Sequence, residues 1–204
     1  MARPLLAMGA ADVAVPPGTF VQAVQQSEEI MRELVLAALD GAATRPRRTA
    51  DLFCGVGTFT LALARRTQVL ALDSDAAAVG ALMAAARHAQ GLKPVVTKVR
   101  DLFREPLTAR ELQPFNAVIL DPPRAGAQAQ ARELARSAVE TVVAVSCDPG
   151  TLARDAQILT DGGYAITDVT PIDQFVYAAH VEIVAVLRKR GPGRRGAARR
   201  RPIS

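Results

Sequence analysis

Between Thr49 and Arg188, short apolar runs alternate with longer segments rich in alanine and leucine. An apolar run of about five or six residues is typical of a strand buried on both faces, and the longer segments have helical spacing. The runs predict strands at Thr49–Phe53, Gln68–Asp73, Val95–Val99, Asn116–Asp121, Thr141–Ser146, Ala165–Thr170 and Val181–Leu187. The longer segments predict helices at Thr58–Arg66, Asp75–Gln90, Ala127–Ala138 and Thr151–Thr160.

This alternation predicts the α/β class: a doubly wound, mainly parallel seven-stranded sheet with helices on both faces. No long helix separates the final strands, so the last one is expected to be antiparallel. Ahead of the sheet, the pattern predicts an amphipathic helix at Gln22–Leu39, and the prolines and glycine in Val15–Phe20 predict a turn. We therefore expect a lead-in segment at 1–21, one domain at 22–190 and a tail at 191–204.

Charge is distributed unevenly along the chain. The net charge is +5, but residues 188–204 hold eight of the 25 Lys and Arg residues and no acid, so the rest is slightly negative. A tail of Gly, Arg and Pro is expected to be disordered. Such a tail can bind a polyanion such as RNA, or it can serve only to keep the protein in solution.

The cysteines and apolar stretches exclude several classes of protein. Cys54 and Cys147 lie in separate motifs without metal-ligand spacing, so neither a metal site nor a disulfide framework is predicted. No apolar stretch approaches the ~18 residues of a membrane span, and no signal peptide is recognisable. We expect a cytoplasmic protein without membrane contact.

A glycine-rich turn follows the first predicted strand, in the segment Asp51-Leu-Phe-Cys-Gly-Val-Gly-Thr58. Ligands of doubly wound folds bind at this edge of the sheet, and Gly55 and Gly57 let the backbone approach one closely. The same Gly-x-Gly pattern also occurs in dinucleotide sites and in ordinary tight turns. The turn alone therefore indicates a ligand site without naming the ligand.

Aspartates end the next three strands: Asp73, Asp101 and Asp121. Their common edge predicts one acidic crevice, in which Asp73 could accept hydrogen bonds from two ribose hydroxyls. The alternative for each residue is a cap of the following helix or turn. A third glycine and an Arg partner for a diphosphate are missing, which favours a cofactor without one.

Four motifs appear in the order seen in one enzyme family: the Asp51–Thr58 turn, Asp121-Pro-Pro-Arg-Ala-Gly126, the run from Val145 to Asp155, and His180-Val-Glu182. Over residues 15–188 the chain resembles the catalytic domain of RNA uridine-C5 methyltransferases. This resemblance implies a Rossmann-like class I methyltransferase that uses S-adenosyl-L-methionine. The implied activity is formation of 5-methyluridine at an accessible loop of tRNA or rRNA.

The resemblance also assigns roles to residues inside the matching motifs. Cys147 would be the nucleophile that adds to C6 of uracil, Glu182 the base that removes the C5 proton, and Asp121 a further catalytic group. The target base must leave its stack to reach them. The positions implied for cofactor binding are Gln22, Phe53, Gly55, Gly57, Thr58, Asp73, Asp101 and Asp121. We interpret Cys54 as a packing residue and His180 as a positioning residue.

The chain departs from the family at several positions. Asp148 replaces the usual Asn after the nucleophile, and a carboxylate there is expected to raise the pKa of the Cys147 thiol. Thr58 stands where Asn is common. The family's β-barrel RNA-binding domain is not recognisable, so RNA recognition is expected from the tail or from a separate domain or subunit.

Two other functions remain open. The Asp121-Pro-Pro-Arg element also resembles that of amino-methylating enzymes, which would make the chain a methyltransferase without covalent catalysis. The Asp148 replacement is also compatible with an inactive remnant that binds RNA or cofactor.

Overall fold

The computed structural model describes residues 5–8, 11–18, 25–42, 44–173 and 181–191. Gln22, His180 and the predicted tail from residue 192 onward lie outside this part of the chain. The strands are β1 (Leu5–Met8), β2 (Ala11–Ala14), β3 (Arg48–Leu52), β4 (Gln68–Asp73), β5 (Val95–Val99), β6 (Ala117–Leu120), β7 (Thr141–Ser146), β8 (Tyr164–Asp173) and β9 (Val181–Lys189). The helices are α1 (Gln25–Asp40), α2 (Thr60–Leu63), α3 (Ala76–His88), α4 (Gln128–Arg136) and α5 (Pro149–Asp161).

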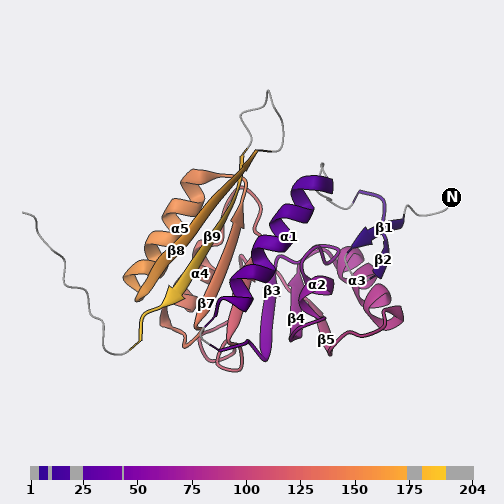
Figure 1. The fold of residues 1–204 in the computed structure, drawn as a ribbon, viewed down its shortest axis with the longest axis horizontal. Helices are drawn as coiled ribbons and strands as arrows, with labels where there is room; N and C mark the ends of the chain where they lie inside the picture. The colour runs from indigo at the N-terminus through magenta and orange to yellow at the C-terminus, as the bar shows by residue number, and fades with distance from the viewer. Residues whose placement is uncertain (1–4, 9–10, 19–24, 43, 174–180, 192–204) are drawn as a thin grey trace, which may run out of the picture.

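The main sheet has seven strands among the described residues, in the order β5-β4-β3-β6-β7-β9-β8 (Figure 1). The pairs from β5 to β7 are parallel, and β9 runs antiparallel to both β7 and β8. The chain moves outward from β3 to β5 and then returns to β6 on the other side of β3. This arrangement confirms the predicted doubly wound sheet with an antiparallel last strand. Its strand order reverses beside β3, where folds of this class leave a crevice at the carboxyl ends of the strands.

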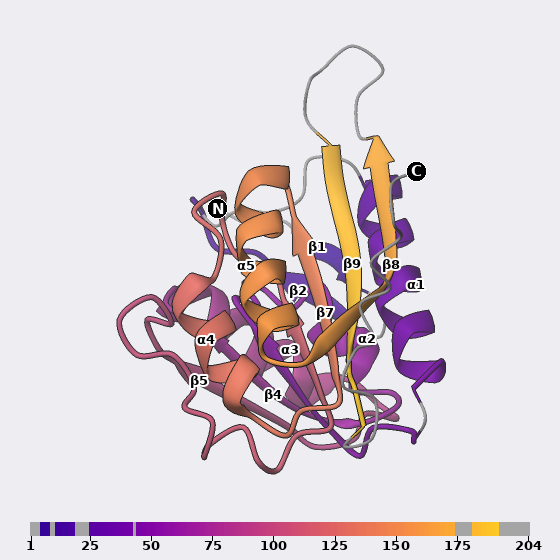
Figure 2. The ribbon, with the colours of Figure 1, turned by 90° about the vertical axis from the view of Figure 1, so that its left-hand side faces the viewer.

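Each face of the sheet carries its own hydrophobic cluster. One cluster joins α1, α2 and α3 to the sheet, through residues such as Met31, Phe59 and Leu82. The other joins α4 and α5 to the opposite face, through residues such as Leu134 and Leu159. Figure 2 shows α4 and α5 on one side of the strands and α1 on the other. No helix in the described part of the chain combines the length and apolar character that a membrane crossing requires.

Two differences from the prediction go beyond shifted ends. The first is α2, which spans Thr60–Leu63 instead of 58–66. After it, the amide of Arg66 bonds to the carbonyl of Leu63 at 2.8 Å, three residues back, so the chain tightens into turns. The second is the β1–β2 hairpin, which was not predicted and which lies against α3. Its four-residue strands are too short to give a recognisable period, although Met8 and Val13 are buried.

Candidate functional site

The register of the central strands gathers three carboxyl groups at one place. Asp51 of β3 pairs with Ala71 of β4 on one side and with Ile119 of β6 on the other. Alternate residues of a strand share a face, and Asp73 and Asp121 follow these two partners by two positions. Asp51, Asp73 and Asp121 therefore leave the same face of the sheet, at the carboxyl ends of three adjacent strands.

The alternation of side chains along β6 and β7 places Cys147 beside these three carboxyl groups. Val143 of β7 pairs with Ile119 of β6, so odd-numbered residues of both strands share one face. Cys147 comes directly after β7, whose last residue is Ser146, and it is half-buried. The thiol thus lies on the face of Asp121, one strand further along the sheet.

Glu182 lies across the antiparallel ladder from Cys147. The β7–β9 register runs to Ser146 opposite Ile183, so the next position sets Cys147 opposite Glu182. Electrostatics agrees with this placement, because Glu182 raises the pKa of the Cys147 thiol. The predicted nucleophile and base, which are far apart in the sequence, are neighbours in the fold.

The glycine-rich turn has a strongly constrained backbone. Phe53, Gly55 and Gly57 all have positive φ, of 64°, 51° and 100°. A Cβ on Gly57 would lie 2.4 Å from Cδ1 of Leu82, whereas a Cβ on Gly55 would meet no atom within 4 Å. Gly57 is therefore needed for close packing of α3, while Gly55 borders open space where a ligand could approach.

Asp101 makes the local hydrogen bonds that the capping alternative anticipated, whereas the N-cap of α3 is Asp75 and Asp73 also reaches back to Gly55. The carboxylate of Asp73 accepts from the amide of Gly55 at 2.8 Å and from the amide of Asp75 at 2.9 Å. Asp101 accepts from the amides of Phe103 at 2.9 Å and Arg104 at 3.3 Å. Asp73 thereby ties the glycine-rich turn to the end of β4, and the two carboxylates flank the predicted cofactor position.

Phe103 is a residue of this region that sequence reasoning missed. Its ring lies 5.4 Å from the ring of Phe53, tilted by 55°, and its side chain is half-exposed. The pair forms an apolar wall beside Asp101. A signal was available, since Asp101-Leu-Phe103 repeats the Asp-Leu-Phe sequence of residues 51–53.

The pKa of Asp121 is raised by burial and by neighbouring acids. Burial raises the pKa of this carboxyl group well above its usual range, and the negative charges of Asp51, Glu182, Asp73 and Glu28 raise it further. Glu28 projects from α1 and forms an ion pair with Arg32 at 3.2 Å. Acidic groups from β3, β4, β9 and α1 therefore act together on Asp121.

The pKa of the Cys147 thiol is raised, as predicted, but Asp148 is not the cause. Burial is the largest contribution that raises the pKa of Cys147, followed by Glu182, while Arg124 lowers it through its charge and a hydrogen bond. Asp148 instead caps α5, where its side chain accepts from the amide of Thr151 at 2.8 Å, and these bonds lower its own pKa. The helix terminus holds the carboxylate, so it is not among the causes of the thiol's shift.

Asp51 was quoted in the turn motif but was not predicted as a site residue. It is completely buried, and its Oδ2 accepts from Oγ1 of Thr60 at 2.5 Å. Its Oδ1 has no hydrogen-bond partner among the described residues. Burial, with a further contribution from Asp73, raises its pKa to about 7. An acid inside an apolar central strand was the signal available in the sequence.

Thr58 and Cys54 complete the turn. Thr58 is half-buried just before α2. Cys54 is buried, its Sγ lies 3.7 Å from the carbonyl oxygen of Gly55, and burial raises its pKa well above the usual range. Among the described residues, no group of three or more His, Cys, Asp or Glu side chains is arranged to hold a metal ion.

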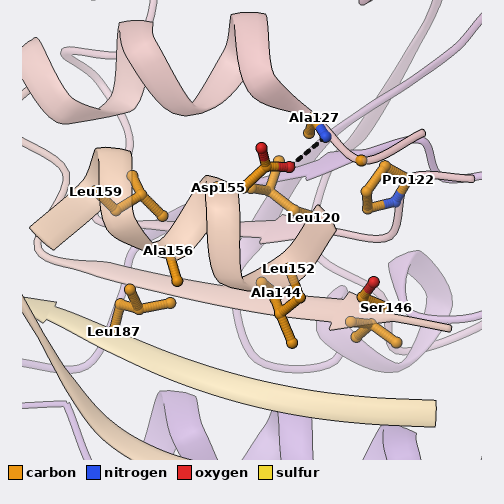
Figure 3. Close-up of a pocket in the computed structure, with 12 residues that line it drawn as sticks. Leu120, Pro122, Ala127, Ala144, Ser146, Leu152, Asp155, Ala156, Leu159 and Leu187 are labelled. Atoms are coloured by element: carbon orange, nitrogen blue, oxygen red, sulfur yellow. Dashed lines mark hydrogen bonds between the residues drawn. The ribbon is translucent and has the colours of Figure 1, made fainter. Parts of the chain in front are cut away.

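Two pockets lie outside this cluster. Figure 3 shows the first, between β6, β7 and the α4–α5 side of the sheet, where Asp155 accepts from the amide of Ala127 at 2.5 Å. Its volume of about 10 Å³ suits one water molecule at most. The second, of about 410 Å³, lies between the β1–β2 hairpin and α3. Neither contains a predicted site residue.

Comparison with known proteins agrees with the geometry. The model of the family described as tRNA (uracil-5-)-methyltransferase matches residues 16–190. An uncharacterized RNA methyltransferase of Brucella suis is 59% identical over 187 residues, covering 92% of this chain and 44% of that protein. The 23S rRNA (uracil(1939)-C(5))-methyltransferase RlmD of Chromohalobacter salexigens is 41% identical, over 86% of this chain and 36% of that protein.

Solved structures show the same similarity. The tRNA (uracil-54, C5)-methyltransferase of Pyrococcus abyssi, in complex with S-adenosyl-L-homocysteine, superposes with a TM-score of 0.76 and 28% identity. That match covers 92% of this chain and 44% of the archaeal one. The chain spans less than half of the length of the curated relatives it matches most extensively. Since the family model covers most of the chain, the chain belongs to the tRNA (uracil-5-)-methyltransferase family.

Proposed function

We propose that the chain is the catalytic part of an RNA uracil-C5 methyltransferase that uses S-adenosyl-L-methionine. One observation carries the proposal: extended by one position past their last paired residues, the β6–β7 and β7–β9 registers bring Cys147, Glu182 and Asp121 together on one face of the sheet. A thiol with a carboxylate on each side is the set of groups that methylation at C5 of uracil requires.

The residues of the crevice fit this cofactor. S-adenosyl-L-methionine carries a sulfonium cation, two ribose hydroxyls and an adenine, and it supplies the methyl group when bound. Asp73 lies beside the turn and is suited to accept from the ribose hydroxyls. Phe53 and Phe103 offer apolar surface to a flat ring. The acids around Asp121 provide the negative potential that a cation requires.

Cys147 and Glu182 divide the covalent chemistry between them. The Sγ of Cys147 would bond to C6 of uracil, which moves the electrons of the C5–C6 double bond into an enolate. C5 then takes the methyl group. The carboxylate of Glu182 removes the C5 proton, the electrons of that C–H bond restore the double bond, and the S–C6 bond breaks to release the thiolate.

The RNA is expected to be ribosomal. The relative named as a 23S rRNA methyltransferase is 41% identical to this chain, against 28% for the archaeal tRNA enzyme. The base must be unstacked to enter the crevice, so a loop or bulge is the expected target. We further propose that a separate RNA-binding domain or subunit supplies most of the sequence choice.

A methyltransferase that acts without covalent catalysis is the second candidate. It is favoured by the raised pKa of Cys147, because a thiol that stays protonated at neutral pH is a weak nucleophile. Arg124, which follows Asp121-Pro-Pro, lowers the pKa of the thiol and so favours the covalent function. The two functions predict different results when the thiol is removed, because only the covalent one needs it.

The test uses RNA that contains 5-fluorouridine, from which C5 cannot lose a proton after methyl transfer. The 204-residue chain is incubated with the cofactor and with fluorinated 23S rRNA or tRNA, and a denaturation-resistant adduct is sought by mass spectrometry. We expect an adduct at Cys147 with rRNA, its loss in Cys147→Ala, and its retention in Cys54→Ala, the matched control.

Methyl transfer that survives in Cys147→Ala would instead establish the noncovalent alternative. An adduct that forms with tRNA only would reverse the choice of RNA while leaving the covalent mechanism in place. No adduct and no methyl transfer, in a chain that binds the cofactor, would contradict the proposed reaction.

A further inference from the structure

The buried acid Asp51 is the starting point. It lies in β3, between the strand that ends in Asp73 and the strand that precedes Asp121, and none of its surface is exposed. Its Oδ2 is bound by Thr60 of α2, while its Oδ1 has no partner within the described part of the chain. A buried polar atom without a partner is rare in folded proteins and calls for a functional or structural reason.

The charged groups around Asp51 are almost all acidic. Asp73 faces it from β4, Asp121 from β6 and the thiol of Cys54 from the turn. Glu28 of α1 and Glu182 of β9 act on the same cluster through Asp121. The nearby cations are already engaged, since Arg32 pairs with Glu28 and Arg124 acts on Cys147. Within the described residues, the acids of the crevice therefore outnumber the bases.

The three aspartates are not equivalent in this setting. Both oxygens of Asp73 accept hydrogen bonds from backbone amides, those of Gly55 and Asp75. Asp121 is half-buried and also faces the nucleophile and base. Asp51 alone among them combines complete burial with a free oxygen. Its charge is thus sensitive to whether a cation binds nearby.

Methyl transfer changes the charge of the ligand by one. The sulfonium of S-adenosyl-L-methionine is positive, whereas the thioether of S-adenosyl-L-homocysteine is neutral, and the two molecules are otherwise nearly identical in shape. A site that excludes water magnifies such a difference, because charges interact more strongly at low dielectric constant. A fixed negative charge already favours the sulfonium form, and a carboxyl group that loses its proton only when the cation is bound makes this preference depend on pH.

We propose that Asp51 makes the crevice select S-adenosyl-L-methionine over S-adenosyl-L-homocysteine, by losing a proton when the sulfonium form binds and regaining it when the thioether forms. This inference rests on the cofactor named under the proposed function. The proton leaves the carboxyl group for solvent on binding and returns from solvent after methyl transfer, so each turnover balances. Product then faces a neutral acid and leaves more readily.

The proton linkage has a defined pH window. The pKa of Asp51 in the free protein is about 7, and a bound cation lowers it. Affinity for S-adenosyl-L-methionine must then rise with pH up to about 7 and level off above it. The largest slope for one proton is about tenfold per pH unit. The affinity for S-adenosyl-L-homocysteine should change much less over this interval.

Isothermal titration calorimetry measures the proton directly. Each ligand is titrated at pH 6.5 into the full chain in two buffers that differ in ionisation enthalpy, and the difference in heat gives the protons released. We expect S-adenosyl-L-methionine to release close to one proton and S-adenosyl-L-homocysteine much less. Repeating the titrations at pH 5.5 and 7.5 should increase the affinity ratio of the two ligands severalfold.

Asp51→Asn keeps the shape of the side chain and removes its charge. We expect this variant to lose the difference in proton release and to bind both ligands with a nearly pH-independent ratio. Asp155→Asn, which changes another buried carboxyl group on the opposite side of the sheet, should behave as the wild type. Circular dichroism establishes that both variants are folded.

Several results would overturn the proposal. Equal proton release for the two ligands in the wild-type chain contradicts it, even if Asp51→Asn does not fold. An unchanged proton count in a folded Asp51→Asn assigns the linkage to another group. If neither ligand binds, the proposed cofactor itself is wrong, whereas binding without a proton difference removes only the role of Asp51.

Discussion

The thiol of Cys147 lies between an acid and a base that act on it in opposite directions. Burial and Glu182 raise its pKa, and Arg124 lowers it. Glu182 adjoins Ile183, the last residue of β9 that pairs with β7, while Arg124 follows Asp121-Pro-Pro. The residue that removes a proton late in the proposed reaction therefore also hinders formation of the thiolate at its start.

Glu182→Gln should make the thiol more reactive while it abolishes methyl transfer. Removal of the negative charge lowers the pKa of Cys147, so alkylation by iodoacetamide at pH 8 is expected to become about two to five times faster. The rate is followed by mass spectrometry of the Cys147 peptide over a range of pH. Asp148→Asn is the control and should leave the profile unchanged, because Asn also caps a helix. A profile that moves in Asp148→Asn but not in Glu182→Gln would refute this assignment.

Single residues also mark where sequence reasoning reached its limit. Cys147, Glu182 and Asp121 lie in motifs and Asp73 ends a predicted strand, so their presence at one edge of the sheet was foreseeable. The role of Asp148 was not, because its hydrogen bond to the start of α5 depends on a rotamer. The complete burial of Asp51 follows only when strands and helices from distant parts of the sequence are assembled around it.

Among the elements, three strands of the mainly parallel sheet were the most predictable. The predicted bounds of β4, β5 and β7 agree with the structure residue for residue. Their apolar runs are bordered by polar or turn-forming residues, which makes the ends readable. In contrast, β8 is longer than predicted because pairing with β9 extends it past Pro171, and a bulge at 166–168 breaks its period.

The glycine-rich turn gives a prediction at the scale of elements. Gly55 and Gly57 both have positive φ, but only at Gly57 would a Cβ meet Leu82 of α3. Gly57→Ala should destabilise the protein by about 2–4 kcal/mol, and Gly55→Ala by only about 1 kcal/mol. Urea unfolding followed by circular dichroism compares the two variants. Equal losses would mean that contact between the turn and α3 does not fix the turn.

At the scale of the whole molecule, the acidic crevice sets how stability varies with pH. Asp51 has a pKa of about 7 in the folded chain against 3.8 for the ordinary group, so the folded state binds more protons between these values. The stabilising contribution of Asp51 to the free energy of unfolding is fully present below about pH 4 and is lost as the pH rises through about 7. Asp121 and Glu28, whose pKa values are also raised, act in the same direction. Glu111, whose pKa falls to about 2 beside Arg100, acts in the opposite direction at lower pH.

The free energy of unfolding should therefore decrease between pH 5 and pH 7.5, with Asp51 contributing about 2–3 kcal/mol of the loss at most. Asp51→Asn should flatten the curve, since its amide does not ionise and can still accept from Thr60. Urea midpoints at four pH values, with Asp155→Asn as the control, provide the measurement. A wild-type midpoint that rises across this interval would show that the buried acid is ionised at little cost.

The ladder between β7 and β9 also restricts how the gene can change. Side chains alternate between faces, so inserting or deleting one codon between Glu182 and Lys189 would turn the carboxylate away from Cys147 and reverse the inward and outward positions of the strand. The edge strand β8 already carries one such irregularity, at 166–168. Evolution is therefore expected to accept length variation in β8 and in the segment after β5, and to reject it in β9.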